Sequence, residues 1–248
     1  MQTRLRITAV LRSYTLRLCL ALGVTAWLVV PARALTAAEI ITEARVLLND
    51  NSSDTGRQRF SDAQLLRFIN DGQREANIFS WVLKSSYSLT LTAGTTEYPV
   101  PSDFLTTWRV TYEGRKIDQT SLNELDSNSP GFATASGRPQ KYYLYLATTT
   151  WIGFTPAPNS TSTGTVVMYY VQQPTEITST SSSPWNSWTL LTPYHSGLVY
   201  YTVYRGYQAM MEAEMAASYF TEWTLFVQSL KLAGIQQPDF NPGISGRR

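Results

Sequence analysis

Cysteine and histidine are nearly absent from this sequence of 248 residues, which contains one residue of each. A disulfide framework needs paired cysteines and a structural zinc site needs several cysteine or histidine ligands, so neither fits within one chain. No P-loop, nucleophile-elbow or dinucleotide-binding glycine motif occurs. The sequence therefore predicts a protein that is not an enzyme and needs no cofactor, with no catalytic, cofactor-binding or metal-binding residue.

Charged residues are also scarce, at 15% of the chain, and the excess of positive charge is confined to the N-terminus. Residues 1–34 carry five arginines and no acidic residue, which leaves 15 of the 20 basic residues against 18 acidic ones in the remainder. A body that is slightly acidic lacks the basic surface by which proteins generally bind nucleic acid.

The first 34 residues show the three parts of a secretory signal peptide. Four arginines lie within residues 1–17, an apolar run follows from Leu18 to Val30, and Ala32-Arg33-Ala34 matches a cleavage signal. The apolar run is too short for a comfortable membrane span. The alternative is a miscalled start, with Leu35 read as the true first residue. A genuine leader would place the protein in the periplasm or outside the cell.

Helix signals flank the middle of the chain. Thr36–Glu39 and Ser61–Gln64 are capping boxes that predict two N-terminal helices, and the second has an apolar stripe from Leu65 to Phe79. Thr192-Pro193 is typical of a helix start. A further stripe contains Ala216, Phe220, Trp223, Val227 and Leu230 and predicts a last helix that ends at Gly234.

Between these helices the pattern changes to the alternation that is typical of strands. Strands are expected near residues 87–91, 108–112, 142–146, 151–154 and 165–171, with turns at Ala93-Gly94 and Glu113-Gly114 and a short helix capped by Ser121. The prediction is an α+β fold: a four-helix bundle, made of two N-terminal and two C-terminal helices, with an inserted small antiparallel β domain. The expected parts are the leader or miscalled start at 1–34, the N-terminal helix pair at 35–84, the β domain at 85–175, a Ser/Thr/Trp loop at 176–191, the C-terminal helix pair at 192–234 and an extended tail at 235–248.

The candidate functional residues are contacts with partner proteins. His195, the single imidazole, falls in the first turn of a predicted helix, where a structural or solvated role outweighs a catalytic one. Two tryptophans after the Ser/Thr loop are expected to pack or to meet a partner, because fully exposed tryptophans are unusual. The tail ends in two arginines and would order on docking to a neighbour. The predicted partner contacts are Trp185, Trp188, Phe240, Arg247 and Arg248.

A series of short strings occurs in order between residues 36 and 234. They are Arg59-Phe60-Ser61-Asp62, Tyr98-Pro99-Val100-Pro101-Ser102-Asp103-Phe104, Gly114 with Ser121 and Glu124-Leu125, Pro139 with Tyr142-Tyr143, Ile152-Gly153-Phe154-Thr155-Pro156-Ala157-Pro158, and Tyr169-Tyr170 before Pro174. In this order, with a helix pair on either side, the strings resemble those of the head-to-tail adaptor (connector) proteins of tailed bacteriophages.

The resemblance implies a structural virion protein at the head–tail junction, assembled in the host cytoplasm. Copies would form a ring, commonly a dodecamer, that joins the portal protein to a tail or nozzle protein and continues the DNA channel. DNA would pass through this ring without sequence-specific binding. The alternative is an exported binding module for a glycan or a surface partner, which the leader and the 12% aromatic content favour.

Overall fold

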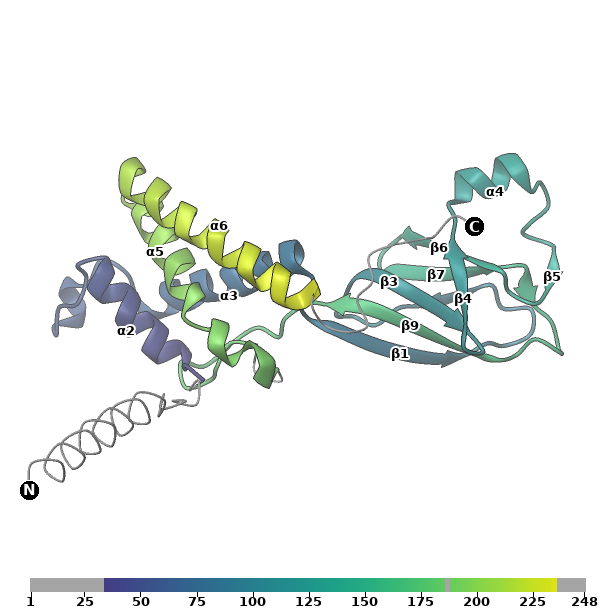
Figure 1. Cartoon of the computed structure of the whole chain (residues 1–248), viewed down its shortest axis with the longest axis horizontal. Coiled ribbons are helices and arrows are strands. Elements are labelled where there is room, and N and C mark those ends of the chain that lie inside the picture. Colours follow the sequence, from purple (N-terminus) through teal and green to yellow (C-terminus); the bar gives the residue numbers. More distant parts are fainter. Residues whose placement is uncertain (1–33, 186–187, 236–248) are drawn as a thin grey trace, which may run out of the picture. The chain divides into compact units, whose positions relative to one another are not determined.

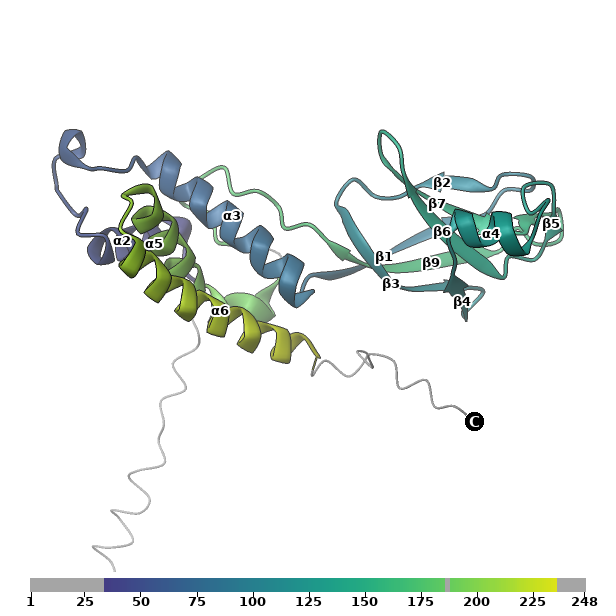
Figure 2. The same cartoon turned by 90° about the horizontal axis from the view of Figure 1, so that it is seen from above.

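A computed structural model describes residues 34–185 and 188–235 (Figure 1). The protein is an α+β structure in which helices from both ends of the chain pack together, and the residues between them form a seven-stranded sheet. Helix α5 (Gly197–Ala209) contacts α2 (Ala37–Leu47), α3 (Asp62–Ser80) and α6 (Ala213–Ile235). Helices α3 and α6 also lie side by side (Figure 2).

Both N-terminal helices begin at the predicted capping boxes. The Thr36 hydroxyl accepts from the Glu39 N–H, and the Glu39 carboxylate accepts from the Thr36 N–H at 2.8 Å. Ser61 and Gln64 exchange the same pair of hydrogen bonds at the start of α3. Each box satisfies two donors that a helix start otherwise leaves unpaired, which confirms these two predictions.

The C-terminal helices differ from the sequence prediction at their ends. Thr192-Pro193 does not start an α-helix, because both residues lie in the 3₁₀ helix η2 (Thr189–Tyr194), and α5 begins at Gly197. A proline suits the first turn of either an α-helix or a 3₁₀ helix. Here the chain forms the tighter 3₁₀ turn, in which the His195 N–H donates to the Thr192 carbonyl. Gly234 lies inside α6 and does not follow it.

The sheet has the strand order β1-β9-β3-β4-β6-β7-β2 and is curled into a half-barrel (Figure 1). Its strands are β1 (Lys84–Thr90), β2 (Glu97–Pro99), β3 (Phe104–Tyr112), β4 (Arg115–Gln119), β6 (Lys141–Leu146), β7 (Thr150–Thr155) and β9 (Thr165–Gln172). A separate short pair is formed by β5 (Ser136–Gly137) and β8 (Ala157–Pro158). The predicted turn at Glu113-Gly114 joins β3 to β4, with both residues at positive φ.

The prediction of a purely antiparallel β domain is wrong at two pairs of strands: β5 pairs with β8 in parallel, and a second parallel pair lies within the main sheet. Strand β4 pairs with β6 in parallel, with Asp118 opposite Lys141. Parallel neighbours need a long crossover connection. This chain makes the crossover through the short helix α4 (Leu122–Asn128), capped by Ser121 as predicted, and through β5. The sheet is therefore mixed.

Candidate interaction surface

The helical part of the protein exposes many large hydrophobic side chains. Among the described residues, the exposed large hydrophobic side chains of the sheet part are those of Leu122 and Leu146. The remaining ones are Val46, Leu47, Ile78, Phe79, Trp81, Leu190, Tyr200, Met211, Met215, Phe220, Leu225 and Leu232. Scattered exposed hydrophobics are ordinary on a protein surface, whereas a concentration of them on one part marks an interaction site.

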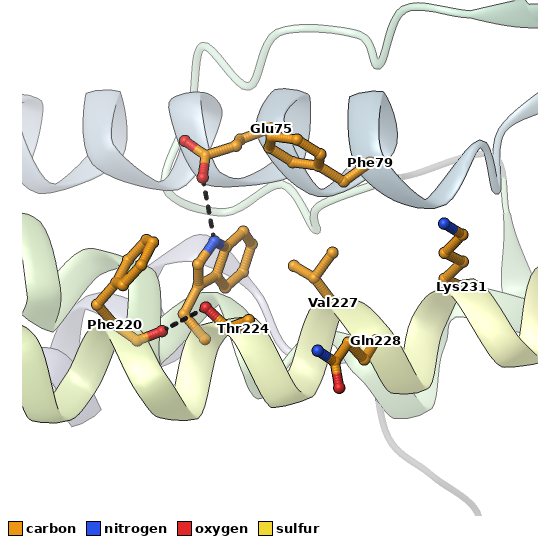
Figure 3. Close-up of a pocket in the computed structure, with 8 residues that line it drawn as sticks. Glu75, Phe79, Phe220, Thr224, Val227, Gln228 and Lys231 are labelled. Carbon is orange, nitrogen blue, oxygen red and sulfur yellow. Dashed lines mark hydrogen bonds between the residues drawn. The ribbon is translucent and has the colours of Figure 1, made fainter.

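A groove between α3 and α6 lies within this surface and has a volume of about 280 Å³ (Figure 3). Phe79 and Phe220 are 59% and 45% exposed, while Trp223 is 2% exposed. Figure 3 shows Lys231 toward one end of the groove and Phe220 toward the other, with Glu75 on the facing helix. The lining residues are Glu75, Phe79, Phe220, Trp223, Thr224, Val227, Gln228 and Lys231.

Glu75 fixes the two aromatic residues beneath the groove. Its carboxylate accepts from the Tyr201 hydroxyl at 3.0 Å and from the Trp223 Nε1–H at 3.2 Å. Burial, opposed by a hydrogen bond from Arg205 and reinforced by the Glu75 charge, raises the pKa of Tyr201 to about 12, so Tyr201 remains a donor. The Glu75 carboxylate thus holds the Tyr201 and Trp223 side chains in place at the groove. Such a surface suits the packing of another protein.

Gly72 allows α3 to come close to α5 behind this groove. A Cβ at this position would lie 2.9 Å from the Tyr201 ring, closer than ordinary packing permits. The absence of a side chain at Gly72 therefore allows the Tyr201 ring, which Glu75 holds, to lie directly against α3. This glycine interrupts the predicted apolar stripe of α3, and its role is close approach between helices.

The structure places the two predicted tryptophan contacts in or on the helical core. Trp185 is 3% exposed and its ring centroid lies 6.0 Å from that of His195. Its side chain is buried within the chain, and its contact with a partner stays a prediction. Trp188 is half-buried and packs against the same core, so its contact with a partner stays a prediction. The other predicted contacts, Phe240, Arg247 and Arg248, lie outside the described residues.

His195 has a structural position between η2 and α5. It is 2% exposed, and its Nδ1 lies 3.1 Å from the carbonyl oxygen of Leu35. The role is therefore structural and not solvated. Burial lowers the pKa of His195 below its ordinary value, and the contact with the Leu35 carbonyl opposes this shift only in part.

The depressed pKa of His195 makes stability depend on pH. The unfolded chain binds a proton before the folded one, so we expect the free energy of unfolding to be constant above pH about 6.5 and to fall as the pH drops below it, toward the folded-state pKa. Denaturant unfolding at a series of pH values from 7.5 to about 5.5, above the range of most carboxylates, measures this slope. His195→Asn removes the single imidazole and should flatten it. An unchanged slope in that variant would contradict the assignment.

The strings that carry the family resemblance make structural contacts. Phe104 stacks on Tyr170 at a centroid distance of 5.9 Å, and Asp103 accepts from the Tyr170 hydroxyl at 3.0 Å. The Tyr98 hydroxyl accepts from the Thr92 N–H at 2.7 Å, in the turn before β2. These residues fix the paths of strands and turns, so these strings contribute to the fold.

Comparison with known proteins identifies the protein family. Over residues 35–243 the sequence matches the family described as SU10 adaptor protein, whose members are phage adaptor proteins, structural and not catalytic. The chain belongs to the SU10 adaptor protein family. This confirms the resemblance to phage adaptors, and membership implies a virion protein that binds other virion proteins. Among curated proteins the comparison finds no match.

Neither a metal-binding cluster nor a membrane-spanning helix is found in the part of the chain that the structure describes. In residues 34–185 and 188–235, no group of three or more histidine, cysteine, aspartate or glutamate residues is placed to hold a metal ion. Within the same ranges, none of the helices combines the length and apolar character that crossing a membrane requires.

Proposed function

We propose that copies of this protein form a ring, a dodecamer by resemblance to head-to-tail adaptors, between the portal protein and a tail or nozzle protein. Family membership supports a role in joining virion proteins. The observation that carries the proposal is the concentration of exposed hydrophobic side chains on the helices, with the α3–α6 groove among them. In a closed ring each copy meets the next through two different surfaces, and the groove is one of these.

The charge of the body is compatible with a channel through which DNA moves. Beyond residues 1–34, the acidic residues number 18 and the basic residues 15 of the chain's 20. Phosphate contacts with lysine and arginine supply most of the sequence-independent affinity for DNA. A channel wall without a basic excess would let DNA pass without gripping it and without reading its sequence.

Purified virions test this function directly. We expect mass spectrometry to detect the protein in intact particles at a fixed number of copies per portal ring, and cryo-electron microscopy to show it directly below the portal. Assembly takes place in the host cytoplasm under this proposal. Absence of the protein from purified, infectious particles would overturn it.

The groove provides a more local prediction. Phe79→Ser combined with Phe220→Ser should abolish incorporation of the protein into particles, because both rings are exposed in the single chain and would be covered in the ring. Substitutions at exposed positions change the free energy of unfolding by only about 0.5 kcal/mol, so the variant should remain folded. Leu146→Ser is the matched control, since Leu146 is 80% exposed in the sheet part and does not line the groove. Incorporation of the double variant at the level of that control would contradict a role of the groove in assembly.

The second candidate function is an exported binding module for a glycan or a surface partner. The arginines, the apolar run and the Ala32-Arg33-Ala34 string of the leader favour it. The intact mass of the native protein separates the two candidates. A chain that starts at Leu35 after cleavage indicates export, whereas a chain that starts with methionine in place of Leu35 indicates an internal start and cytoplasmic assembly.

A further inference from the structure

A second pocket, in the sheet part of the chain, has a composition unlike that of the helical groove. It lies against β2, β6 and β7, where β2 is one of the two edge strands of the sheet, and has a volume of about 160 Å³. Glu97 is its charged residue, and aromatic and aliphatic side chains make up most of its walls. The lining residues are Thr96, Glu97, Leu122, Phe132, Ala133, Tyr143 and Phe154.

The register of three strands builds this pocket. Gly153 of β7 pairs with Glu97 of β2 on one side and with Tyr143 of β6 on the other. A Cβ at Gly153 would overlap the Tyr143 ring, so the ring lies across the glycine. The Tyr143 hydroxyl thereby reaches Glu97 Oε1 and donates to it at 3.1 Å, and the Tyr145 hydroxyl donates to Oε2 at 2.8 Å. The strand register, and not a flexible loop, positions the carboxylate.

Glu97 differs from Glu113, Asp118 and Glu124 of the same part of the chain, each of which has a cation beside it. Ion pairs join Glu113 to Arg138 at 2.8 Å and Glu124 to Lys141 at 3.2 Å. The ion pairs formed among the described residues include none to Glu97, although its side chain is half-buried. Two hydroxyl donors stabilise its charge, and burial together with that charge raises the pKa of Tyr143. Each carboxylate oxygen retains a further lone pair that can accept a donor.

We propose that this pocket binds the guanidinium group of an arginine side chain from another protein. A carboxylate at the base with aromatic walls suits a cation that carries an apolar stem. The volume of about 160 Å³ accommodates a guanidinium and the methylene next to it. Arginine is favoured over lysine because its rigid planar fork meets both oxygens of Glu97, and because it stacks on the ring of Phe132 and is less strongly hydrated than an ammonium. This site goes beyond the ring and does not depend on it.

Titration of the full chain with small probes tests the chemistry. N-acetyl-arginine amide should bind saturably, with a Kd on the order of 1–10 mM for so small a ligand. N-acetyl-citrulline amide, its neutral isostere, should show no saturable binding, and N-acetyl-lysine amide should bind several-fold more weakly. Saturation-transfer NMR measures all three. Equal binding of the citrulline probe, or binding of the lysine probe as tight as that of arginine, would overturn the proposal.

Variants locate the site. Glu97→Gln removes the charge but keeps an acceptor for one tyrosine hydroxyl, while the other hydroxyl can accept from the new amide NH2 group; it should weaken arginine binding about tenfold. Phe132→Ala removes a wall outside the tyrosine–carboxylate contacts and should also weaken binding, which keeps the test valid if Glu97→Gln alters the fold. Glu113→Gln is the control, because Glu113 is exposed and paired with Arg138. Unchanged affinity in both the Glu97 and Phe132 variants would refute the assignment.

Discussion

Replacing Arg45 by methionine is expected to lower the free energy of unfolding by about 3–5 kcal/mol, the usual effect of removing one partner of a buried ion pair. Arg45 lies in the last turn of α2, and its NH1 donates to Asp50 Oδ2 at 2.7 Å. The two side chains are 8% and 2% exposed. Methionine fills similar space but leaves the Asp50 carboxylate buried without its cation.

The Arg45 network also determines the path of the chain into α3. Its NH2 group donates to the Phe60 carbonyl at 2.8 Å and to Asp62 Oδ1 at 2.6 Å. Asp50 accepts from the backbone N–H of Arg59 and from that of Phe60. Loss of Arg45 therefore releases residues 50–61 as well as the charge, which is why a large effect is expected.

Denaturant unfolding of the full chain measures the effect of Arg45→Met. Asp62→Asn is the matched control, because Asp62 accepts from the same guanidinium but is 65% exposed, and exposed pairs contribute about 0–1 kcal/mol. The double variant Arg45→Met with Asp50→Asn should recover part of the loss, since it no longer buries a charge. A cost of Arg45→Met no greater than that of Asp62→Asn would show that the buried pair does not stabilise the fold.

The string Arg59-Phe60-Ser61-Asp62, which contributed to the family resemblance, acquires a physical meaning from this network. Phe60 is 6% exposed and both its backbone groups are bonded, Ser61 caps α3, and Asp62 meets Arg45. Sequence alone shows the cap at Ser61, because its partner lies three residues away. The partners of Phe60 and Asp62 lie in α2 and the following loop, at separations that no local pattern encodes.

The starts of α2, α3 and α4 and the tight turn at Glu113-Gly114 could be predicted because their interactions are local. The end of α5 could not, because its Schellman motif places Met211, and not glycine, at the left-handed position with φ 62°. The Glu212 N–H bonds to the Tyr207 carbonyl there, and this joins α5 closely to α6. The parallel pairing of β4 with β6 was missed for another reason: strand neighbours are chosen by the whole sheet, and neither strand's sequence specifies its partner.

The apolar stripes indicated which helix faces are hydrophobic, but not what covers them. Phe79 and Phe220 fall on the predicted stripes of α3 and α6, where periodicity predicts a core position. In the structure they line the mouth of the groove, 59% and 45% exposed, whereas Trp223 on the same stripe is buried. A hydrophobic stripe that is completed by another molecule looks identical in sequence to one completed within the chain. Only the packed structure therefore shows which residues of an apolar stripe remain exposed.

Replacing Asn70 by leucine is expected to lower the free energy of unfolding by about 2–4 kcal/mol, because two buried backbone groups would lose their partners. The Asn70 side chain donates to the Ile177 carbonyl and accepts from the Ile177 N–H, both at 2.9 Å. Gln73 and Asn77, three and seven residues further along α3, bond the carbonyls of Thr175 and Gln172. These amides hold the chain that returns from the sheet against the helix that carries the groove.

Asn123→Leu provides the matched control for Asn70→Leu, since Asn123 is an exposed residue of a helix, and its replacement should change stability by at most about 0.5 kcal/mol. Hydrogen exchange at the Ile177 amide adds a local readout: protection there should fall in Asn70→Leu by more than the loss of global stability explains. Equal unfolding free energies in the two variants would mean that the backbone of residue 177 finds other partners. The spacing of Asn70, Gln73 and Asn77 places their three amides on one buried face of α3. An apolar residue at position 70 would leave backbone groups of the returning chain without hydrogen-bond partners, and for this reason Asn70→Leu should lower the free energy of unfolding more than Asn123→Leu.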